Sequence, residues 1–172
     1  MTSLANSLVM DLEIIDDFLP EKEFEHLQKI MLGINFPWFF SNFCLSPNDK
    51  NQFKFQFVHN IFRYDLGQCS NAYPLFNKCE KLLEVSKLVR IKANLNTRTV
   101  FKRKTGFHND YANMKTSVFY LNTNNGGTKF KHGKFVRSVR NRMITFNSNY
   151  DHTGVTCTDQ NSRVVVNFNY YD

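Results

Sequence analysis

Two stretches in the first half of the chain carry apolar residues at the spacing of an α-helix. One covers residues 20–32, where Pro20 suits the first turn and the apolar stripe consists of Phe24, Leu27, Ile30 and Met31. The other covers residues 71–89, and its stripe consists of Leu75, Phe76, Cys79, Leu82 and Leu83. We predict a helix in each stretch, with its stripe turned toward a hydrophobic core.

Strand-like runs make up most of the remaining chain. Residues 12–19 indicate a short strand that leads into the first helix, residues 37–51 an aromatic loop, and residues 53–65 one strand or a pair. After residue 89 the runs are separated by Gly, Asn and Asp turns, and they cover residues 90–100, 107–111, 115–122, 127–136, 142–148 and 162–171. This order predicts an α+β, mainly β fold, with N-terminal helices packed on one face of a β sandwich or barrel.

Two of these strands have one apolar face and one mixed face. The apolar faces are formed by Ser117, Phe119 and Leu121, and by Val164, Val166, Phe168 and Tyr170. The mixed faces are formed by Thr116, Val118, Tyr120 and Asn122, and by Arg163, Val165, Asn167 and Asn169. A mixed face that points inward suits a barrel that holds a ligand, although a sheet that faces solvent would show the same pattern.

The composition is that of a globular protein. The chain has 172 residues, of which 42% are hydrophobic and 15% aromatic, so a single domain with a sizeable core is expected. The sequence has no long apolar segment and no signal-peptide pattern, which favours a cytoplasmic protein (bacterial or host cytosol) without a membrane partner. The four cysteines lie at positions 44, 69, 79 and 157. They form no CxxC pair, which argues against a zinc ribbon and fits free thiols.

The formal net charge is +7, and the basic residues gather in segments 98–104 and 129–142. Segment 129–142 contains six lysines and arginines and no acid. This permits a polyanionic partner but does not require one, because a solvated basic face gives the same pattern.

His108 and Asp110 stand two residues apart in the sequence GFHNDY. If residues 107–111 form a strand, both side chains project to the same side and can bind one metal ion. His152 lies between two late strand-like runs and can supply the third ligand. The other three histidines have different expected roles. His26 is expected to pack or cap in the first helix, His59 to have a structural role in the first β region, and His132 to lie in an exposed turn.

Two histidines and one carboxylate with open coordination positions are typical of non-haem Fe(II) that activates oxygen. Zn(II) with three protein ligands and a water is the alternative, and it would indicate a hydrolase. A second anchor separates the two, because such oxygenases hold a co-substrate, usually 2-oxoglutarate, by its distal carboxylate. Arg163 opens the last strand and can bind a carboxylate bidentately, and the phenol of Tyr120 can add a hydrogen bond.

Five segments of the sequence resemble the Fe(II)/2-oxoglutarate-dependent dioxygenases, in particular the prolyl-4-hydroxylase-like branch with its small phage and bacterial members. They are FHNDY, TSVFYLN, NNGGTKF, NRMITFNSNYDHTG and SRVVVNFNYY. The resemblance covers residues 88–172, and the N-terminal IIDDFLPEKEFEHLQKI is also similar to the opening of that branch.

The resemblance assigns roles to individual residues. His108 and Asp110 match the HxD motif of the family, His152 matches the distal metal histidine, and Arg163 matches the residue that binds 2-oxoglutarate. Tyr120 stands where the oxygen-sensing members carry an assisting tyrosine. The paired glycines of the following turn are matched by Gly126 and Gly127. Two asparagines on a neighbouring strand could line the 2-oxoglutarate pocket or be ordinary strand residues, namely Asn94 and Asn96.

The resemblance also implies a fold and a reaction. The fold would be a double-stranded β-helix (jelly roll/cupin-like) in one domain over residues 1–172, with helical support and first strands in 1–88 and the jelly-roll core in 89–172. The reaction would hydroxylate a substrate C–H and release succinate and CO2, using Fe(II) and 2-oxoglutarate, with ascorbate as a supporting reductant. A lid could come from residues 42–56 or 96–106.

The substrate class is left open by the sequence. A protein or peptide substrate, hydroxylated in the manner of a peptidyl-prolyl 4-hydroxylase, is the first expectation, and a small molecule or free amino acid is the second. A nucleic acid is the third, and it is less favoured because nucleic-acid demethylases of this superfamily carry a further arginine shortly after the first. No arginine follows Arg163 in this sequence. The oligomeric state is unknown from the sequence.

Overall fold

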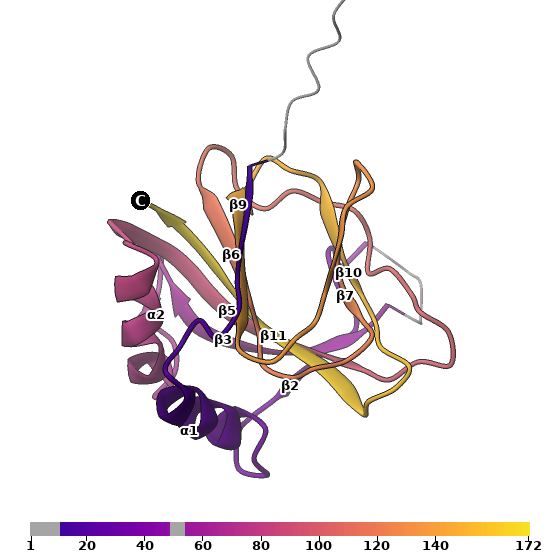
Figure 1. Cartoon of the computed structure of the whole chain (residues 1–172), viewed down its shortest axis with the longest axis horizontal. Coiled ribbons are helices and arrows are strands. Elements are labelled where there is room, and N and C mark those ends of the chain that lie inside the picture. The colour runs from indigo at the N-terminus through magenta and orange to yellow at the C-terminus, as the bar shows by residue number, and fades with distance from the viewer. Residues whose placement is uncertain (1–10, 49–53) are drawn as a thin grey trace, which may run out of the picture.

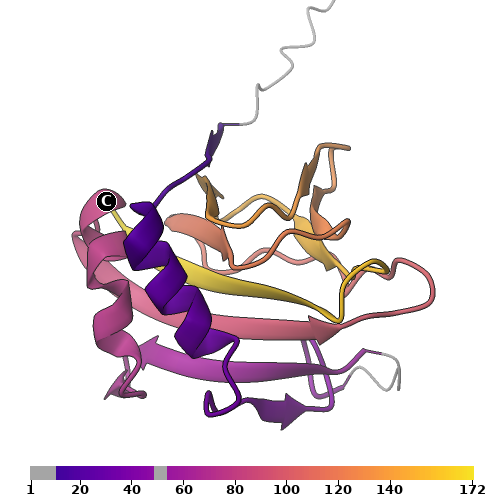
Figure 2. The same cartoon turned by 60° about the horizontal axis from the view of Figure 1, so that its bottom comes forward.

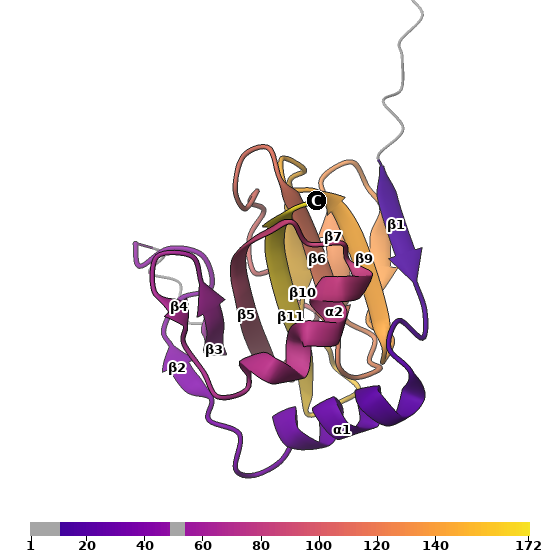
Figure 3. The same ribbon diagram turned by 90° about the vertical axis from the view of Figure 1, so that its left-hand side faces the viewer.

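The computed structural model of the chain describes residues 11–48 and 54–172. Two antiparallel sheets face each other, and the helices lie against the outer face of the larger sheet (Figure 1, Figure 3). No helix in the described part of the chain is both long enough and apolar enough to cross a membrane.

The larger sheet has eight strands in the order β1-β9-β6-β11-β5-β3-β2, with β4 paired to β3 beside this path. Its strands are β1 Leu12–Ile15, β2 Phe39–Ser41, β3 Gln56–Arg63, β4 Gly67–Gln68, β5 Lys87–Thr97, β6 Lys115–Tyr120, β9 Arg142–Asn147 and β11 Ser162–Tyr171. The smaller sheet has the order β10-β7-β8, and its strands are β7 Gly127–Phe130, β8 Phe135–Arg137 and β10 His152–Val155. After β6 the chain crosses to the smaller sheet for β7 and β8, returns to the larger sheet with β9, crosses again with β10 and returns with β11. The two sheets form facing walls (Figure 2), which is the double-stranded β-helix predicted from the sequence.

The first predicted helix is confirmed as α1, Glu21–Met31. Three of its four stripe residues are buried, namely Phe24, Leu27 and Met31, whereas Ile30 at the edge of the stripe is 36% exposed.

The second helix is much shorter than predicted. Residues 71–89 contain a 3-10 turn, η1 Tyr73–Phe76, followed by α2 Asn77–Leu82, and β5 already begins at Lys87. Glu84 adopts φ +53, a left-handed conformation that ends a helix. Because the helix stops there, Leu82 is 46% exposed instead of facing the core.

One further predicted segment differs from the structure. The aromatic stretch 37–51 is not only loop, because it contains the edge strand β2, which pairs with β3. Residues 49–53 lie outside the described part of the chain. Within the run 53–65, predicted as one strand or a pair, residues 56–63 form one strand, β3, which pairs with β5.

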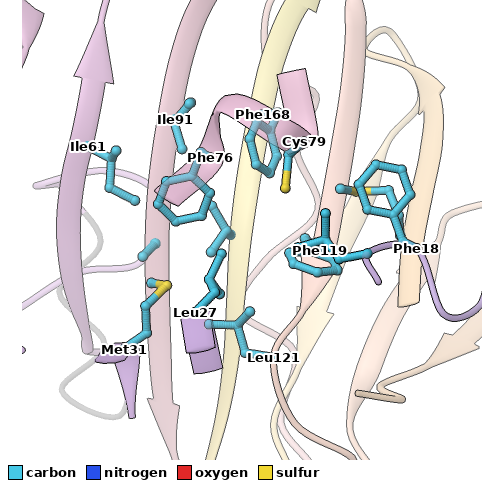
Figure 4. Packing of buried hydrophobic residues seen from close by; sticks show 14 of the residues in the cluster. Phe18, Leu27, Met31, Ile61, Phe76, Cys79, Ile91, Phe119, Leu121 and Phe168 are labelled. Atoms are coloured by element: carbon cyan, nitrogen blue, oxygen red, sulfur yellow. The ribbon is translucent and has the colours of Figure 1, made fainter. Parts of the chain in front are cut away.

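The main hydrophobic core fills the space between the helices and the large sheet. Figure 4 shows Leu27 and Met31 of α1 beside Phe76, with Phe119 and Phe168 on the strands. This core uses the faces of β6 and β11 that alternation predicted to be apolar. The opposite faces of the same strands point between the two sheets, so the fold leaves their polar side chains free to line an interior cavity.

The packing of this core can be tested at Phe119. It is fully buried, and its ring meets Phe18 and Phe24 edge-on at centroid distances of 5.7 and 5.8 Å. Truncating a buried phenylalanine costs about 3–5 kcal/mol, so Phe119→Ala is expected to lower the free energy of unfolding by that amount in urea titrations. Phe101→Ala is the matched control, since that side chain is 75% exposed and should change stability by less than about 0.5 kcal/mol. Equal losses in the two variants would contradict this description of the core.

Ion pairs reduce the charge of segment 129–142. Arg142 binds Asp16 through two hydrogen bonds of 2.6 and 2.8 Å, Arg140 binds Glu21 at 2.8 Å, and Lys131 binds Asp151 at 2.8 Å. Their partners are distant in sequence, except for Asp151, so the acid-free run is locally balanced in the folded chain. None of the four cysteines, all of which lie in the described part of the chain, forms a disulfide.

A candidate metal centre at one end of an interior cavity

The segment that carries His108 and Asp110 is extended but does not form the predicted strand over 107–111. It pairs with β10 through two isolated bridges, Lys104 with Val155 and His108 with His152, rather than through a continuous ladder. Between these bridges the segment advances four residues and β10 advances three, so one residue is left over, as in a β-bulge. Gly106 has φ +122 at this point, and a Cβ there would lie 2.6 Å from the side chain of Leu45. The irregular backbone therefore interrupts the ladder that the sequence predicted.

The same backbone brings three ligand atoms together. The side chains of His108, Asp110 and His152 each offer an atom within 4.8 Å of the others. The Nδ1 atom of His108 lies 3.2 Å from the carbonyl oxygen of Gly106, and that of His152 lies 3.0 Å from that of Tyr150. A carbonyl can only accept, so Nδ1 carries the proton in each ring and Nε2 presents its lone pair. Two imidazole nitrogens and one carboxylate oxygen thus converge without a proton between them, which is a set of donors suited to a cation.

Asp110 is fixed by its neighbours. Its Oδ2 accepts hydrogen bonds from Asn169 Nδ2 at 2.9 Å and from Thr116 Oγ1 at 3.1 Å. Its Oδ1 lies 3.4 Å from Arg90 Nη2 and 3.6 Å from His108 Nε2. Burial alone would raise the pKa of this carboxyl, but His108 and the Arg90 guanidinium hold it well below its usual range. Asp110 is therefore ionised, with one oxygen engaged by the protein and the other facing the histidines.

Arg163 lies at the opposite end of the same cavity. Its guanidinium is buried, with Nη1 3.5 Å from Asn96 Oδ1 and Nη2 3.3 Å from Thr128 Oγ1. Its Nε has no hydrogen-bond partner among the described residues. Desolvation by burial lowers the pKa of this group, and no carboxylate offsets that cost. A buried cation with long and incomplete hydrogen bonds is a site for an anion.

Tyr120 does not face the cavity as the sequence suggested. Its phenol is fully buried and donates a 2.7 Å hydrogen bond to Thr128 Oγ1, while its ring lies 5.6 Å from the Arg163 guanidinium. Thr128, which follows the Gly126–Gly127 turn, lines the cavity in its place. The sequence analysis missed Thr128, although its position on the strand after the paired glycines was a usable signal.

The cavity has a volume of about 400 Å³. Its floor is one face of β5, where alternate residues point inward; these are Arg90, Lys92, Asn94 and Asn96. Both predicted asparagines therefore line it. Arg90 and Lys92 were not predicted, yet they continue the same alternation toward the start of the strand.

The remaining histidines lie away from this centre. His59 is buried and bonds the Pro37 carbonyl oxygen at 2.7 Å and Ser70 Oγ at 2.6 Å, which confirms a structural role. His132 is in an exposed turn, as predicted. His26 is exposed on α1, so the prediction that it packs or caps there was wrong; its helix position faces solvent rather than the sheet.

Comparisons with known proteins extend these observations. No protein-family model matches the chain, and no curated protein matches it. Solved structures do match. A prolyl hydroxylase from Trichoplax adhaerens, in complex with a hypoxia-inducible factor oxygen-degradation-domain peptide, has a TM-score of 0.67 and 17% identity, over 95% of this chain and 84% of that one.

Two bacterial structures are similar to the same extent. An oxidoreductase of the 2OG-Fe(II) oxygenase family from Burkholderia pseudomallei has a TM-score of 0.66 and 12% identity, over 93% of this chain and 85% of that one. A prolyl-4-hydroxylase from Pseudomonas putida has a TM-score of 0.62 and 13% identity, over 95% and 94%. At these identities the likeness establishes the fold, which is that of the 2-oxoglutarate oxygenases, as the sequence resemblance implied.

Proposed function

We propose that this protein is an Fe(II)- and 2-oxoglutarate-dependent dioxygenase. The observation that carries the proposal is that one cavity has the His108, Asp110 and His152 ligand set at one end and, at the other, the buried guanidinium of Arg163, whose Nε has no hydrogen-bond partner among the described residues. The donor set fits Fe(II), since two neutral imidazoles and a carboxylate leave further coordination positions open. The Arg163 guanidinium fits the distal carboxylate of 2-oxoglutarate.

Zn(II) hydrolysis is the alternative for the same three ligands. A hydrolase has no use for Arg163, and burying a guanidinium without an anion costs several kcal/mol. The oxygenase assigns a role to both ends of the cavity and therefore accounts for more of the site.

When bound, Fe(II) and 2-oxoglutarate would supply the oxidising chemistry, in which one atom of O2 enters the substrate as a hydroxyl and the other enters succinate, with loss of CO2. The protein's own contribution is to hold and orient. Arg163, with Asn96 and Thr128 beside it, would fix the distal carboxylate, and Tyr120 would support Thr128 from behind. Asn94 is assigned to the wall of the same pocket. Ascorbate is expected to act only as a supporting reductant.

Asp110 has the orienting role at the metal end. The hydrogen bonds from Asn169 and Thr116 engage Oδ2, so the oxygen that faces the histidines is Oδ1, which also lies 3.4 Å from Arg90 Nη2. Arg90 steadies the same group and donates from Nε to Asn169 Oδ1 at 2.9 Å. We expect one-oxygen coordination by Asp110 for this reason.

For the substrate we propose a protein or peptide, hydroxylated as by prolyl 4-hydroxylases. The similar Trichoplax enzyme, whose structure contains a peptide, supports this choice. A small molecule or free amino acid is the alternative. A nucleic acid is less favoured, because ion pairs balance part of the basic segment 129–142. We further propose that residues 1–172 act as one domain in the cytoplasm, since β3 from the first half of the chain pairs directly with β5, the floor of the cavity.

An anaerobic titration tests the proposed function. Fe(II) is added to the protein, then 2-oxoglutarate, and the visible absorption is recorded; chelation of the keto acid by protein-bound Fe(II) gives a metal-to-ligand charge-transfer band. Glutarate, which lacks the keto group, is the control ligand and should give no band. Admission of O2 should then release succinate in an amount that depends on 2-oxoglutarate. Absence of the band in the wild-type protein, with Zn(II) bound and Fe(II) not, would favour the hydrolase.

A further inference from the structure

Three cations and one carboxylate line the described part of the cavity, and one of the cations has no assigned role. Arg163 is assigned to the co-substrate. Arg90 is engaged by Asp110 and Asn169 and lies 5.2 Å from the ring centroid of Tyr111. Lys92 points into the same cavity, and within the described residues no hydrogen bond or ion pair engages its ammonium group.

The position of the Lys92 ammonium destabilises the protein when no ligand is bound. Desolvation, and then the nearby charge of Arg90, lower the pKa of Lys92 to about 8, and the smaller opposing effects of Asp110 and Cys44 do not offset them. Lysines of no function usually extend into solvent, because a desolvated ammonium without a counter-ion loses hydration that nothing replaces. Four other lysines or arginines on the surface form ion pairs that are solvent-accessible. Lys92 is held inward by the alternation of β5 instead.

A neighbouring group completes an anion site. Asn167 on β11 is the cross-strand partner of Lys92, and it lines the cavity too. Its Oδ1 atom is buried and has no hydrogen-bond partner among residues 11–48 and 54–172. Cross-strand side chains on one face lie within reach of each other. An ammonium has three N–H donors, so one can be oriented by this oxygen while two remain for a ligand.

We propose that Lys92 binds a carboxylate of the substrate, which makes the substrate of this enzyme an acid. The inference rests on the proposed dioxygenase function and names the substrate chemistry of that site. The carboxylate would lie close to the C–H that reacts, because Lys92 and the metal ligands line one cavity of about 400 Å³. An acidic peptide and a free carboxylic acid share this chemistry, and the experiment below distinguishes them.

Lys92 and Arg163 serve different carboxylates. Arg163 pairs across the sheet with Asn96, and Lys92 lies four residues before Asn96 on β5, about 13 Å along a strand. The two side chains therefore leave the sheet at separate positions along the cavity. The effect of Lys92→Met on 2-oxoglutarate affinity, measured below, tests whether they bind separate carboxylates. Binding a dication and a dianionic co-substrate would leave the net charge of the cavity unchanged, so the attraction for a further anion persists in the loaded protein.

The first measurement observes Lys92 directly. Surface and cavity lysines are reductively methylated with ¹³C, which keeps their charge, and the Lys92 signal is assigned by its absence in Lys92→Met. The protein is loaded with Zn(II) and 2-oxoglutarate so that Arg163 is occupied and no turnover occurs. Addition of acetate should shift the Lys92 signal, and acetamide should not. The signal of Lys87, which is exposed on the same strand, is the internal control and should stay in place.

The second measurement uses turnover. Two pools of random peptides around a central proline are compared, one with Asp and Glu at the flanking positions and one with Asn and Gln, together with the four free amino acids. The acidic members should stimulate succinate release about 10- to 100-fold more than their amides, as expected for a hydrogen bond between charged groups. Lys92→Met should abolish this preference, Lys92→Arg should retain part of it, and Lys87→Met should retain it fully. Stimulation by the acidic peptides or by the free acids then decides between the two sources.

Several outcomes would overturn the proposal while leaving the dioxygenase intact. One is an acetate-insensitive Lys92 signal in protein that binds 2-oxoglutarate. Another is an acid preference that survives in Lys92→Met. A third is a loss of 2-oxoglutarate affinity in Lys92→Met without loss of acid preference, which would assign Lys92 to the co-substrate. If no compound stimulates turnover, the NMR titration alone decides. Failure of the wild-type protein to bind 2-oxoglutarate would instead refute the proposed function itself.

Discussion

Replacing His108 by alanine is expected to lower the affinity for Fe(II) by roughly 10²–10³-fold and to abolish the charge-transfer band formed with 2-oxoglutarate. The estimate divides the roughly 10–16 kcal/mol of a four-ligand protein zinc site over its ligands, which gives about 2.5–4 kcal/mol for each. The fold should survive, because the side chain of His108 is 28% exposed. We expect the free energy of unfolding of the metal-free protein to change by less than about 1 kcal/mol.

The space left by the ring offers a stringent check. Free imidazole at millimolar concentration should restore part of the band in His108→Ala, because it can occupy the vacated position and supply the same nitrogen ligand. His132→Ala removes an exposed histidine of the turn between β7 and β8 and should behave as the wild type. Two results would show that His108 is not a ligand. One is an equal loss of Fe(II) affinity in His108→Ala and His132→Ala. The other is that imidazole restores neither Fe(II) binding nor the charge-transfer band in His108→Ala.

Replacing Arg163 by methionine should have opposite effects on the empty and the loaded protein. The variant removes a buried cation whose Nε is unsatisfied, so the protein without 2-oxoglutarate should be as stable as the wild type or more stable. Truncating one partner of a buried charge pair costs about 2–5 kcal/mol, so the Kd for 2-oxoglutarate should rise about 30- to 4,000-fold.

Thermal unfolding with and without 2-oxoglutarate measures both effects. At a ligand concentration of about 100 wild-type Kd the wild type should gain roughly 2.7 kcal/mol of stability, and Arg163→Met should gain less than about 1 kcal/mol at the same concentration. Arg163→Lys keeps the charge but loses the planar fork, and should give an intermediate gain. A methionine variant that is destabilised when empty, yet keeps the ligand-induced gain, would show that Arg163 has a structural role alone.

The elements that the sequence predicted well are those with long, regular patterns. The stripe of α1 and the alternation of β6 and β11 were confirmed, because each pattern repeats over two or more turns or over several residue pairs. The predicted length of the second helix was wrong, because the backbone conformation of a single residue ends the helix although the apolar stripe continues. Glu84 at φ +53 ends α2, and neither its identity nor its spacing announces this.

The site was predictable only in part, for a physical reason. His108, Asp110, His152 and Arg163 lie near the ends of recognisable segments, so their meeting could be expected. Interactions that depend on strand register could not. The contact of Thr128 with both Tyr120 and Arg163 depends on which strand of the small sheet faces β6 and β11. The same holds for the ion pair between Asp16 and Arg142, which are 126 positions apart.

The mutual hydrogen bonds of His108 and His152 have a consequence for the life of the protein in a cell. Each residue donates its backbone N–H to the carbonyl of the other, at 3.0 and 2.9 Å. The folded main chain therefore brings the two imidazoles together. The conformational entropy of these residues is lost when the protein folds, and not when the metal binds. Small zinc domains unfold when their ion departs. This protein should instead stay folded without Fe(II) and bind the metal again when it becomes available, as the proposed function requires.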